Sequence, residues 1–329
     1  MELQTLLITG SNGLVGTYLK EVITERSMNV FYNIIYLNRQ DIDLRNENDV
    51  LQYFEKTKPS IVIHLAASVG GLYYNLENNY TIFSDNMKIN NNILTACDIF
   101  KVSKLINILS TCIFPDVKDN HTTFESNKKN TTLNSKEIHN GIPHASNEGY
   151  SYSKRMLEIG SRLLTKKNNN FSVVNLIPTN LYGKYDNYNL KNAHVIPALI
   201  HKIYLAKKNN QPTIEIKGGG LAKRQFLYAK DFANIIVQFI NYKKEQCVSC
   251  IVSPPIKEEI NIAIIVDKLC ECFSVDCPII YNTESQGQYK KTCDNNELSQ
   301  FIDFKFTSLD IGLQETVDYF IKNFKNVRK

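Results

Sequence analysis

Three side chains in the middle of the chain have the types and spacing that carbonyl reduction requires. Tyr150 and Lys154 lie four residues apart in a helix-like segment, so both side chains point into one cleft. A phenol with an ordinary pKa of about 10 needs an adjacent cation to donate a proton at neutral pH. Ser110 ends an apolar run 40 residues earlier, where its hydroxyl can orient a carbonyl. We interpret Ser110, Tyr150 and Lys154 as a candidate catalytic triad.

The same tyrosine–lysine spacing occurs a second time, at Tyr204 and Lys208. Among 18 tyrosines, such pairs arise by chance, so context must decide. Tyr150 has Ser151 and Ser153 beside it and a serine at the end of a preceding strand, whereas Tyr204 has no such partner. Context favours Tyr150, and an ordinary surface helix is the alternative.

A glycine-rich turn near the N-terminus predicts a dinucleotide site. The turn follows the first apolar run and opens a helix, and glycines there bring backbone N–H groups to a pyrophosphate. The residues of this turn are Gly10, Ser11, Asn12, Gly13, Leu14, Val15 and Gly16. An ordinary strand-to-helix turn is the alternative, but the βα repeats that follow agree with the cofactor interpretation.

The end of the second apolar run indicates which nicotinamide cofactor binds. Proteins that use NAD place Asp or Glu there for the ribose hydroxyls, whereas this chain has Asn38 and Arg39. A guanidinium suits the 2′-phosphate of NADP(H), which we therefore expect; a solvated surface arginine is the alternative. We expect Asp43 to contact the adenine and Leu44 to belong to the same site.

The elements that must position these residues form a βα repeat. Short apolar runs alternate with helix-like stretches, and strands buried on both faces imply a parallel, doubly wound, Rossmann-like α/β sheet. The expected strands are residues 6–8, 33–37, 61–65, 105–109 and 173–177, and the expected helices are 14–26, 46–57 and 80–101.

Beyond Pro178 the alternation weakens, which predicts a smaller, interleaved α/β lobe for the substrate. It should contain a helix at 195–208 and a strand at 213–216. We expect an NADP-binding domain at residues 1–178 with 226–245 packing back on it, and a substrate-binding lobe at 179–225 and 246–329. Residues 126–136 are almost free of apolar side chains and predict a mobile inserted loop.

The composition indicates a globular protein without a membrane span. The 329 residues are 43% hydrophobic and 22% charged, and no apolar run approaches the roughly 18–20 residues of a membrane span. The N-terminus runs directly into a strand pattern, so we expect a cytoplasmic protein without a membrane partner. With 38 basic and 33 acidic residues the net charge is only +5, and no nucleic-acid partner is expected.

Eight cysteines raise the alternative of a zinc site. Cys247 and Cys250, or Cys270 with Cys272 and Cys277, have suggestive spacings. The first pair lies in an apolar strand pattern and the trio continues a helical apolar stripe. We expect free thiols and no metal.

Several longer motifs are shared with one enzyme family. They are His64-Leu65-Ala66-Ala67-Ser68-Val69-Gly70-Gly71, Leu109-Ser110-Thr111-Cys112-Ile113-Phe114-Pro115, Gly149-Tyr150-Ser151-Tyr152-Ser153-Lys154, Pro178-Thr179-Asn180-Leu181-Tyr182-Gly183, Asp186-Asn187, His194-Val195-Ile196-Pro197-Ala198-Leu199 and Arg224-Gln225-Phe226. With the glycine loop, they span nearly the whole chain. The chain resembles the extended short-chain dehydrogenase/reductases of sugar nucleotides and, within them, the GDP-L-fucose synthases.

The resemblance implies NADPH-dependent 3,5-epimerisation and 4-reduction of GDP-4-keto-6-deoxy-D-mannose to GDP-L-fucose, by a homodimer. It implies that Cys112 and His194 are the acid/base pair that inverts C3 and C5. Protons α to a ketone are acidic enough for a thiol and an imidazole, with ordinary pKa values of about 8.5 and 6.5, to exchange them. A buried strand-end thiol and a structural histidine are the alternative roles.

The resemblance also implies the remaining contacts. Along the cofactor it places Ile108, Leu109, Ser110, Thr111, Tyr150, Lys154, Pro178, Thr179, Asn180, Leu181 and His194. Near the nucleotide sugar it places Lys202, Lys217, Arg224 and Lys290 or Lys291. Lys217 departs from the family, because many members carry Trp there.

Two other functions are weighed against this one. A nucleotide-sugar 4-epimerase or 4,6-dehydratase of the same fold would not require Cys112 with His194. A non-catalytic NADP-binding regulator would be expected to lose at least one of Ser110, Tyr150 and Lys154, and all three are present.

Overall fold

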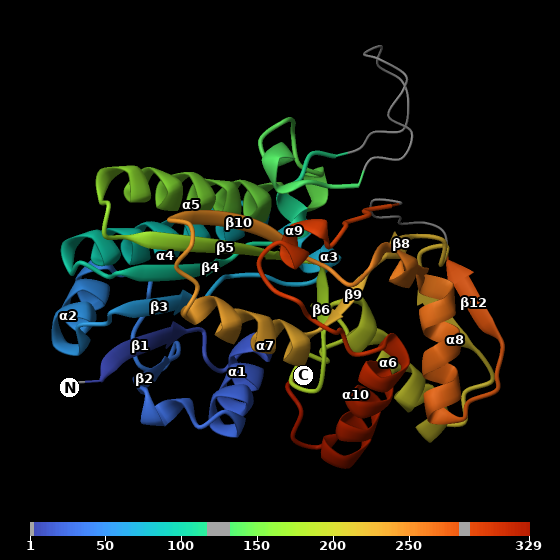
Figure 1. Cartoon of the computed structure of the whole chain (residues 1–329). Coiled ribbons are helices and arrows are strands. Elements are labelled where there is room, and N and C mark those ends of the chain that lie inside the picture. Colours follow the sequence, from blue (N-terminus) through green and yellow to red (C-terminus); the bar gives the residue numbers. More distant parts are fainter. Residues whose placement is uncertain (1–2, 117–131, 283–289) are drawn as a thin grey trace, which may run out of the picture.

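The computed structural model describes residues 3–116, 132–282 and 290–329 and has a six-stranded sheet at its centre (Figure 1). Its strand order is β10-β5-β4-β3-β1-β2, and every neighbouring pair is parallel. The strands are β1 (Gln4–Thr9), β2 (Tyr32–Leu37), β3 (Ile61–His64), β4 (Lys104–Ile108), β5 (Ser172–Pro178) and β10 (Cys247–Val252). The predicted parallel, doubly wound α/β fold is confirmed.

Helices cover both faces of this sheet (Figure 1). On one face lie α2 (Glu47–Thr57), α4 (Asn79–Ile99) and α5 (Glu148–Lys167), and on the other lie α1 (Leu14–Glu25) and α7 (Ala229–Ile240). Successive strand residues such as Leu6 and Leu7 enter different apolar cores, which explains the continuous apolar runs. No helix in the described ranges is both long and apolar enough to cross a membrane.

The second lobe lies beyond the carboxyl ends of the strands (Figure 1). It contains three two-stranded sheets, which pair β6 with β9, β7 with β12 and β8 with β11. Its elements are β6 (Asn180–Tyr182), α6 (Val195–Lys208), β7 (Ile214–Lys217), β8 (Lys223–Arg224), β9 (Phe226–Tyr228), β11 (Ile260–Asn261), α8 (Ile262–Phe273), β12 (Ile279–Asn282) and α10 (Leu309–Asn323).

Short helices connect these elements. They are η1 (Met28–Val30), α3 (Leu72–Glu77), η2 (Thr111–Ile113), η3 (Ser135–Glu137), η4 (Ala145–Asn147), η5 (Ile256–Glu258) and α9 (Asn296–Ser299). Two of them lie next to residues of the expected site, because η2 follows β4 at the carboxyl edge of the sheet and α3 follows the Gly70–Gly71 pair.

The expected lobe boundary at residue 246 does not follow the sheet. The strand β10 directly after it pairs with β5 in parallel, with Val248 opposite Val174, so it belongs to the main sheet. Four of its six residues, Val248 and Cys250 to Val252, are buried, as suits a strand of a sheet covered by helices. The helix α7 packs against α1 and β4, on the sheet. The functional division into a cofactor domain and a substrate lobe stays a prediction.

The expected mobile loop at 126–136 falls partly outside the described residues, which resume at 132. Its last residues are held by backbone hydrogen bonds: Leu133 N donates to Thr292 O at 2.9 Å and Ser135 N to Glu297 Oε1 at 2.8 Å. The other carboxylate oxygen of Glu297 accepts from Ile251 N in β10 at 3.0 Å. Residues 133 and 135 are therefore hydrogen-bonded to the rest of the fold, Ser135 to the sheet through Glu297, and the mobility of the segment stays a prediction.

The eight cysteines are free thiols. Cys250 is fully buried in β10, and Cys270, Cys272 and Cys277 pack against the core as partly buried side chains. Among the described residues, no group of three or more His, Cys, Asp or Glu side chains is placed to hold a metal ion.

Candidate active site

The ammonium of Lys154 joins α5 to the carboxyl end of β4. Lys154 is only 2% exposed, and its Nζ donates to Ile108 O at 2.7 Å. Burial lowers the pKa of this ammonium to about 8, since a charge is disfavoured away from water. The helix is thereby fixed over the edge of the sheet where parallel α/β folds bind their ligands.

The turn η2 contains Cys112 and directly follows Ser110, and hydrogen bonds from neighbouring side chains fix its backbone. Ser110 Oγ accepts from Cys112 N at 3.2 Å, while Ser151 Oγ of α5 donates to Cys112 O at 2.8 Å. The buried Arg155 donates through Nε to Ile113 O at 2.7 Å. A hydroxyl can accept and donate at once, so Ser110 retains its proton for a carbonyl. Sequence reasoning had assigned no role to Ser151 or Arg155.

Tyr150 lies beside this turn, one helical turn before Lys154 in α5. Its side chain is buried, and the Nζ of Lys154 is 5.8 Å from its ring centroid. Burial raises the pKa of Tyr150, and the nearby Cys112 thiol raises it further. The sequence predicted a pKa tuned downward by the lysine. In the protein alone burial and the Cys112 thiol raise the pKa instead, so the phenol keeps its proton.

The alternative pair, Tyr204 and Lys208, belongs to an aromatic cluster in the second lobe. The ring of Tyr204 lies 5.4 Å from that of Phe320 and 4.4 Å from that of Phe324. Lys208 Nζ lies 5.3 Å from the centroid of Phe324. These contacts are structural, so the structure favours Tyr150 and Lys154 as the reactive pair.

The glycine loop has a shape that only small residues permit. Gly10 has φ +67°, and a Cβ there would lie 2.8 Å from Ala66 N. A Cβ on Gly16 would lie 2.6 Å from the backbone of Ser11, so α1 packs closely on the loop. Gly13 begins α1 without a side-chain cap, which leaves N–H groups of the first turn for a phosphate. Asn12 accepts from Lys20, and Leu14 and Val15 pack against the core.

Two buried hydroxyls test whether a dinucleotide fits this edge. Within the described part of the chain, Ser11 Oγ and Thr179 Oγ1 are buried and have no hydrogen-bond partner. Buried polar atoms are normally paired, so a bound polar ligand would satisfy both. Thr179 lies between β5 and β6, where Asn180 Nδ2 also donates to Gln225 O at 3.0 Å. These residues therefore fit the dinucleotide that the glycine loop predicts.

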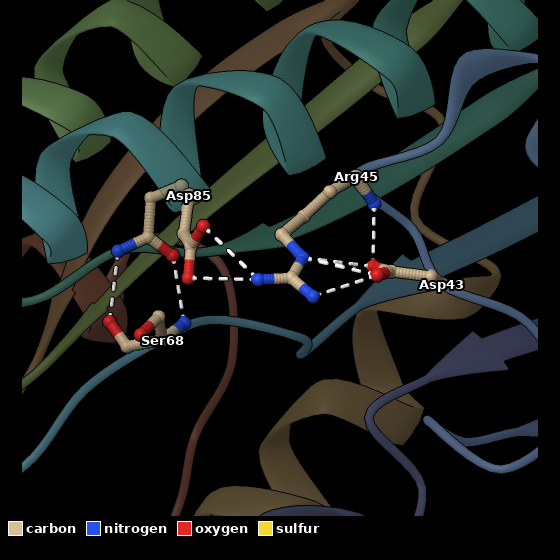
Figure 2. Close-up of polar contacts among 5 residues, drawn as sticks. Asp43, Arg45, Ser68 and Asp85 are labelled. Atoms are coloured by element: carbon tan, nitrogen blue, oxygen red, sulfur yellow. Dashed lines mark hydrogen bonds and ion pairs between the residues drawn. The ribbon is translucent and has the colours of Figure 1, made fainter.

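An ion-pair network lies where the adenine of the cofactor is expected to bind (Figure 2). Arg45 bridges Asp43, at 2.7 Å, and Asp85 of α4, at 3.2 Å. The hydrogen bonds from Arg45 hold the pKa of Asp43 at about 2. Leu44 is buried, and its carbonyl accepts from α4, whereas Arg39 is exposed. Sequence reasoning missed Arg45, although its position two residues after Asp43 was a usable signal.

The remaining expected cofactor residues lie at the same edge. Ile108, Leu109 and Thr111 are buried where β4 passes into η2. Pro178 ends β5, and Leu181 lies in β6. The carboxyl ends of β4 and β5 are neighbours in the sheet, so these residues form one continuous border.

His194 stands where α6 begins, as the residue before its first turn. Its side chain is exposed. The buried Asp186 lies close enough for the His194 charge to act on it: burial raises the pKa of Asp186, and His194 opposes that shift. Sequence reasoning placed Asp186 in a shared motif without giving it a role.

The expected substrate cations are brought together only in part. Burial lowers the pKa of Arg224, and the Cys112 thiol opposes that effect, which places this guanidinium near the turn η2. Lys202 donates to a carbonyl of β7 at 2.6 Å, and its pKa is lowered by burial and then by Lys217. Lys290 lies close to Arg224, because it forms a β-bridge with Lys223, and its Nζ is 3.6 Å from the carboxylate of Glu259.

Lys217 contacts an aromatic residue from the other lobe. Its Nζ lies 4.8 Å from the ring centroid of Tyr73, in the short helix α3. Such a cation–π contact is worth about 0.5–1 kcal/mol at an exposed site. Lys217 is therefore linked to an aromatic side chain of the other lobe.

Comparisons with known proteins agree with this geometry. Residues 6–262 match the NAD dependent epimerase/dehydratase family. A GDP-L-fucose synthase of Dictyostelium discoideum is 40% identical over 99% of this chain and 98% of its own length. A protein named "Probable GDP-L-fucose synthase" from Drosophila melanogaster is 33% identical over 99% of this chain and its own full length (100%).

Solved structures give the same result. A gdp-l-fucose synthetase from Naegleria fowleri, bound to NADP, is 33% identical to this chain with a TM-score of 0.88. The similarity covers 99% of this chain and 95% of that one. The present chain belongs to the NAD dependent epimerase/dehydratase family and, within it, to the GDP-L-fucose synthases.

Proposed function

We propose that this protein is an NADPH-dependent oxidoreductase with epimerase activity that converts GDP-4-keto-6-deoxy-D-mannose to GDP-L-fucose. The observation that carries the proposal is the docking of α5 on β4. It gathers Tyr150, Lys154 and the turn with Ser110 and Cys112 at one edge of the sheet. The full-length similarity to GDP-L-fucose synthases supports this choice of substrate.

We assign NADP(H) to the border between the glycine loop and β6. The loop from Gly10 to Gly16 would hold the pyrophosphate, Arg39 the 2′-phosphate, and Asp43 with Leu44 the adenine end. The nicotinamide half would lie along Ile108–Thr111 and Pro178–Leu181, with Tyr150, Lys154 and His194 beside it. When bound, NADPH supplies the hydride that C4 of the sugar receives.

Ser110, Tyr150 and Lys154 serve the reduction of the ketone. Tyr150 donates the proton that the C4 oxygen needs as it becomes a hydroxyl. Ser110 donates a hydrogen bond that orients the same oxygen. Lys154 holds a positive charge close to the phenol, which stabilises the phenolate left after proton transfer.

Cys112 and His194 serve the two inversions. In each, a base removes the proton from a carbon next to the ketone, and an acid returns a proton to the opposite face. The ketone stabilises the intermediate enolate, and Ser110 would hydrogen-bond its oxygen. No hydride moves in these steps, so they are separable from the reduction.

The cations of the second lobe suit a nucleoside diphosphate. We propose that Arg224, Lys202, Lys217 and Lys290 neutralise its phosphates. Arg224 lies nearest the reacting end, because its guanidinium interacts with Cys112. Lys290 would have to leave or share its pairing with Glu259.

We further propose that the protein is a cytoplasmic homodimer. The packed helices α4 and α5 carry exposed apolar side chains, among them Tyr80, which is 81% exposed, and Leu163, which is 53% exposed. A second copy of the chain would bury them. All eight cysteines are free, as is usual in a reducing compartment.

The proposed activity is tested with NADPH and a panel of 4-keto-6-deoxy nucleotide sugars that differ in base and sugar. We expect stoichiometric loss of NADPH absorbance with the GDP-mannose derivative and a lower kcat/KM with the others. Failure to consume NADPH with that derivative would refute the proposal.

Arg39→Ala should weaken the binding of NADPH but not that of NADH, because only NADPH carries the 2′-phosphate that a guanidinium would pair with. The KM for NADPH should rise roughly tenfold, as expected for the loss of about 1.4 kcal/mol, while the KM for NADH changes little. An equal change for both cofactors would contradict the assignment of Arg39.

Two variants should separate the half-reactions. Cys112→Ser replaces an ionisable thiol with a weakly acidic hydroxyl, so deuterium uptake from solvent at C3 and C5 should collapse. Tyr150→Phe should still exchange deuterium, while NADPH oxidation falls by about 10²–10⁴-fold. Deuterium uptake is measured by NMR, and NADPH oxidation is measured by absorbance. Normal exchange by Cys112→Ser, or normal reduction by Tyr150→Phe, would overturn this division of labour.

The reduction rate should depend on the charge of Lys154. Because burial lowers its pKa to about 8, the ammonium is charged below that pH and loses its proton above it. We expect kcat/KM for reduction to fall with rising pH through an apparent pKa near 8.

The matched control is Lys104, whose pKa burial also lowers to about 8 but which lies at the opposite end of β4. Lys104→Arg stays charged and should leave the profile unchanged. A flat rate between about pH 7 and 10 would contradict the role of Lys154.

A further inference from the structure

The turn that leads into His194 is built by asparagine side chains. Asn187 Oδ1 accepts from Asn189 N at 3.1 Å, and Asn187 Nδ2 donates to Asn192 Oδ1 at 2.9 Å. Asn189 O in turn accepts from Ala193 N at 2.8 Å. Local side-chain hydrogen bonds of this kind fix a backbone that regular secondary structure does not. Asn187 is the member that spans the turn.

A glycine from the opposite lobe packs against the same turn. Gly71 N donates to Asn192 O at 2.9 Å, and a Cβ on Gly71 would lie 2.3 Å from Ala193 O and 3.1 Å from Ala193 C. The backbone of Gly71 has φ −70° and ψ 176°, which any residue can adopt. Glycine is therefore required here for space and not for backbone freedom.

The Gly71 loop is itself fixed to the catalytic helix. The buried Asn75 accepts from Gly70 N at 3.1 Å and donates to Asn147 Oδ1 at 2.8 Å. Asn147 is the residue directly before α5, which carries Tyr150. The loop thus relates the start of α5 to the turn before His194, two segments far apart in the sequence.

We propose that Gly71 and Asn187 are positioning residues that set the His194 imidazole against the turn with Cys112. This inference rests on the proposed function, because it assigns them to the epimerisation of the sugar. Neither residue is proposed to touch the reacting atoms. Their effect reaches the chemistry through the backbone of Asn192 and Ala193, the two residues before His194.

The size of the effect follows from the contact distances. A methyl at 2.3 Å from Ala193 O must separate from it by about 1 Å to reach ordinary van der Waals contact, which begins near 3.4 Å. The next residue in the chain is His194, so the imidazole is displaced with the turn. A misplacement of about 1 Å can cost on the order of 10²-fold in rate.

The test compares Gly71→Ala and Asn187→Ala with two matched controls. Gly160→Ala places a methyl 2.6 Å from only the end of the Leu94 side chain, which can rotate. Asn168→Ala removes a similar local hydrogen bond, which Asn168 Oδ1 accepts from Asn170 N directly after the far end of α5. All four full-length variants are incubated with NADPH and GDP-4-keto-6-deoxymannose in deuterated water.

Deuterium uptake at C3 and C5 should fall about 10- to 100-fold in Gly71→Ala and Asn187→Ala. The Kd for NADPH should stay within about twofold, and a larger fraction of product should be reduced at C4 without inversion. A purely structural defect would instead lower exchange, reduction and NADPH binding together. The controls should match the wild type.

Uptake within about twofold of wild type in both variants would overturn the proposal, as would equal loss of NADPH binding. If Gly71→Ala fails to fold, Asn187→Ala decides alone, because it removes hydrogen bonds without adding volume. Absence of exchange in the wild-type protein would refute the proposed function itself, an outcome distinct from normal exchange in the variants.

Discussion

The burial of the Lys154 ammonium is the constraint on which the rest of the site depends. A charge that is 2% exposed is tolerated only with a hydrogen-bond partner, and the carbonyl of Ile108 at the end of β4 supplies it. That hydrogen bond fixes the position of α5 relative to the end of β4. Ser151 and Arg155 on the same helix then bind the carbonyls of the turn that contains Cys112. The Tyr150 phenol and the Cys112 thiol are thereby brought together by one helix.

A neutral polar chain connects this helix with the cofactor loop. Thr9, at the end of β1, hydrogen-bonds His64 Nδ1 at 2.9 Å, and His64 Nε2 donates to Asn90 at 3.1 Å. Asn90 then donates to Ser153 O at 3.1 Å in α5. Burial lowers the pKa of His64 to about 3, so this imidazole stays neutral and the chain carries no charge. The glycine loop and α5 are therefore connected by a chain that stays uncharged at neutral pH.

Much of this architecture could be predicted from local sequence. Continuous apolar runs specified the parallel sheet, and the tyrosine–lysine spacing together with Ser110 pointed to the edge of the sheet where these side chains lie. The rest depends on partners that are distant in the sequence. Nothing near residue 133 signals its bond to Thr292, and no local pattern reveals that Gly71 meets Ala193. The ion pair of Arg45 with Asp85 likewise exists only because α4 packs beside the loop after β2.

The central claim is that one site performs inversion and reduction, and the isotopic pattern of the product tests it most directly. The wild-type protein would be run to completion with NADPH in deuterated water and the product examined by NMR. The account predicts deuterium at C3 and C5, inverted configuration at both carbons, and protium at C4. A product reduced at C4 with protium and unchanged configuration at C3 and C5 would identify a simple ketone reductase and contradict the account.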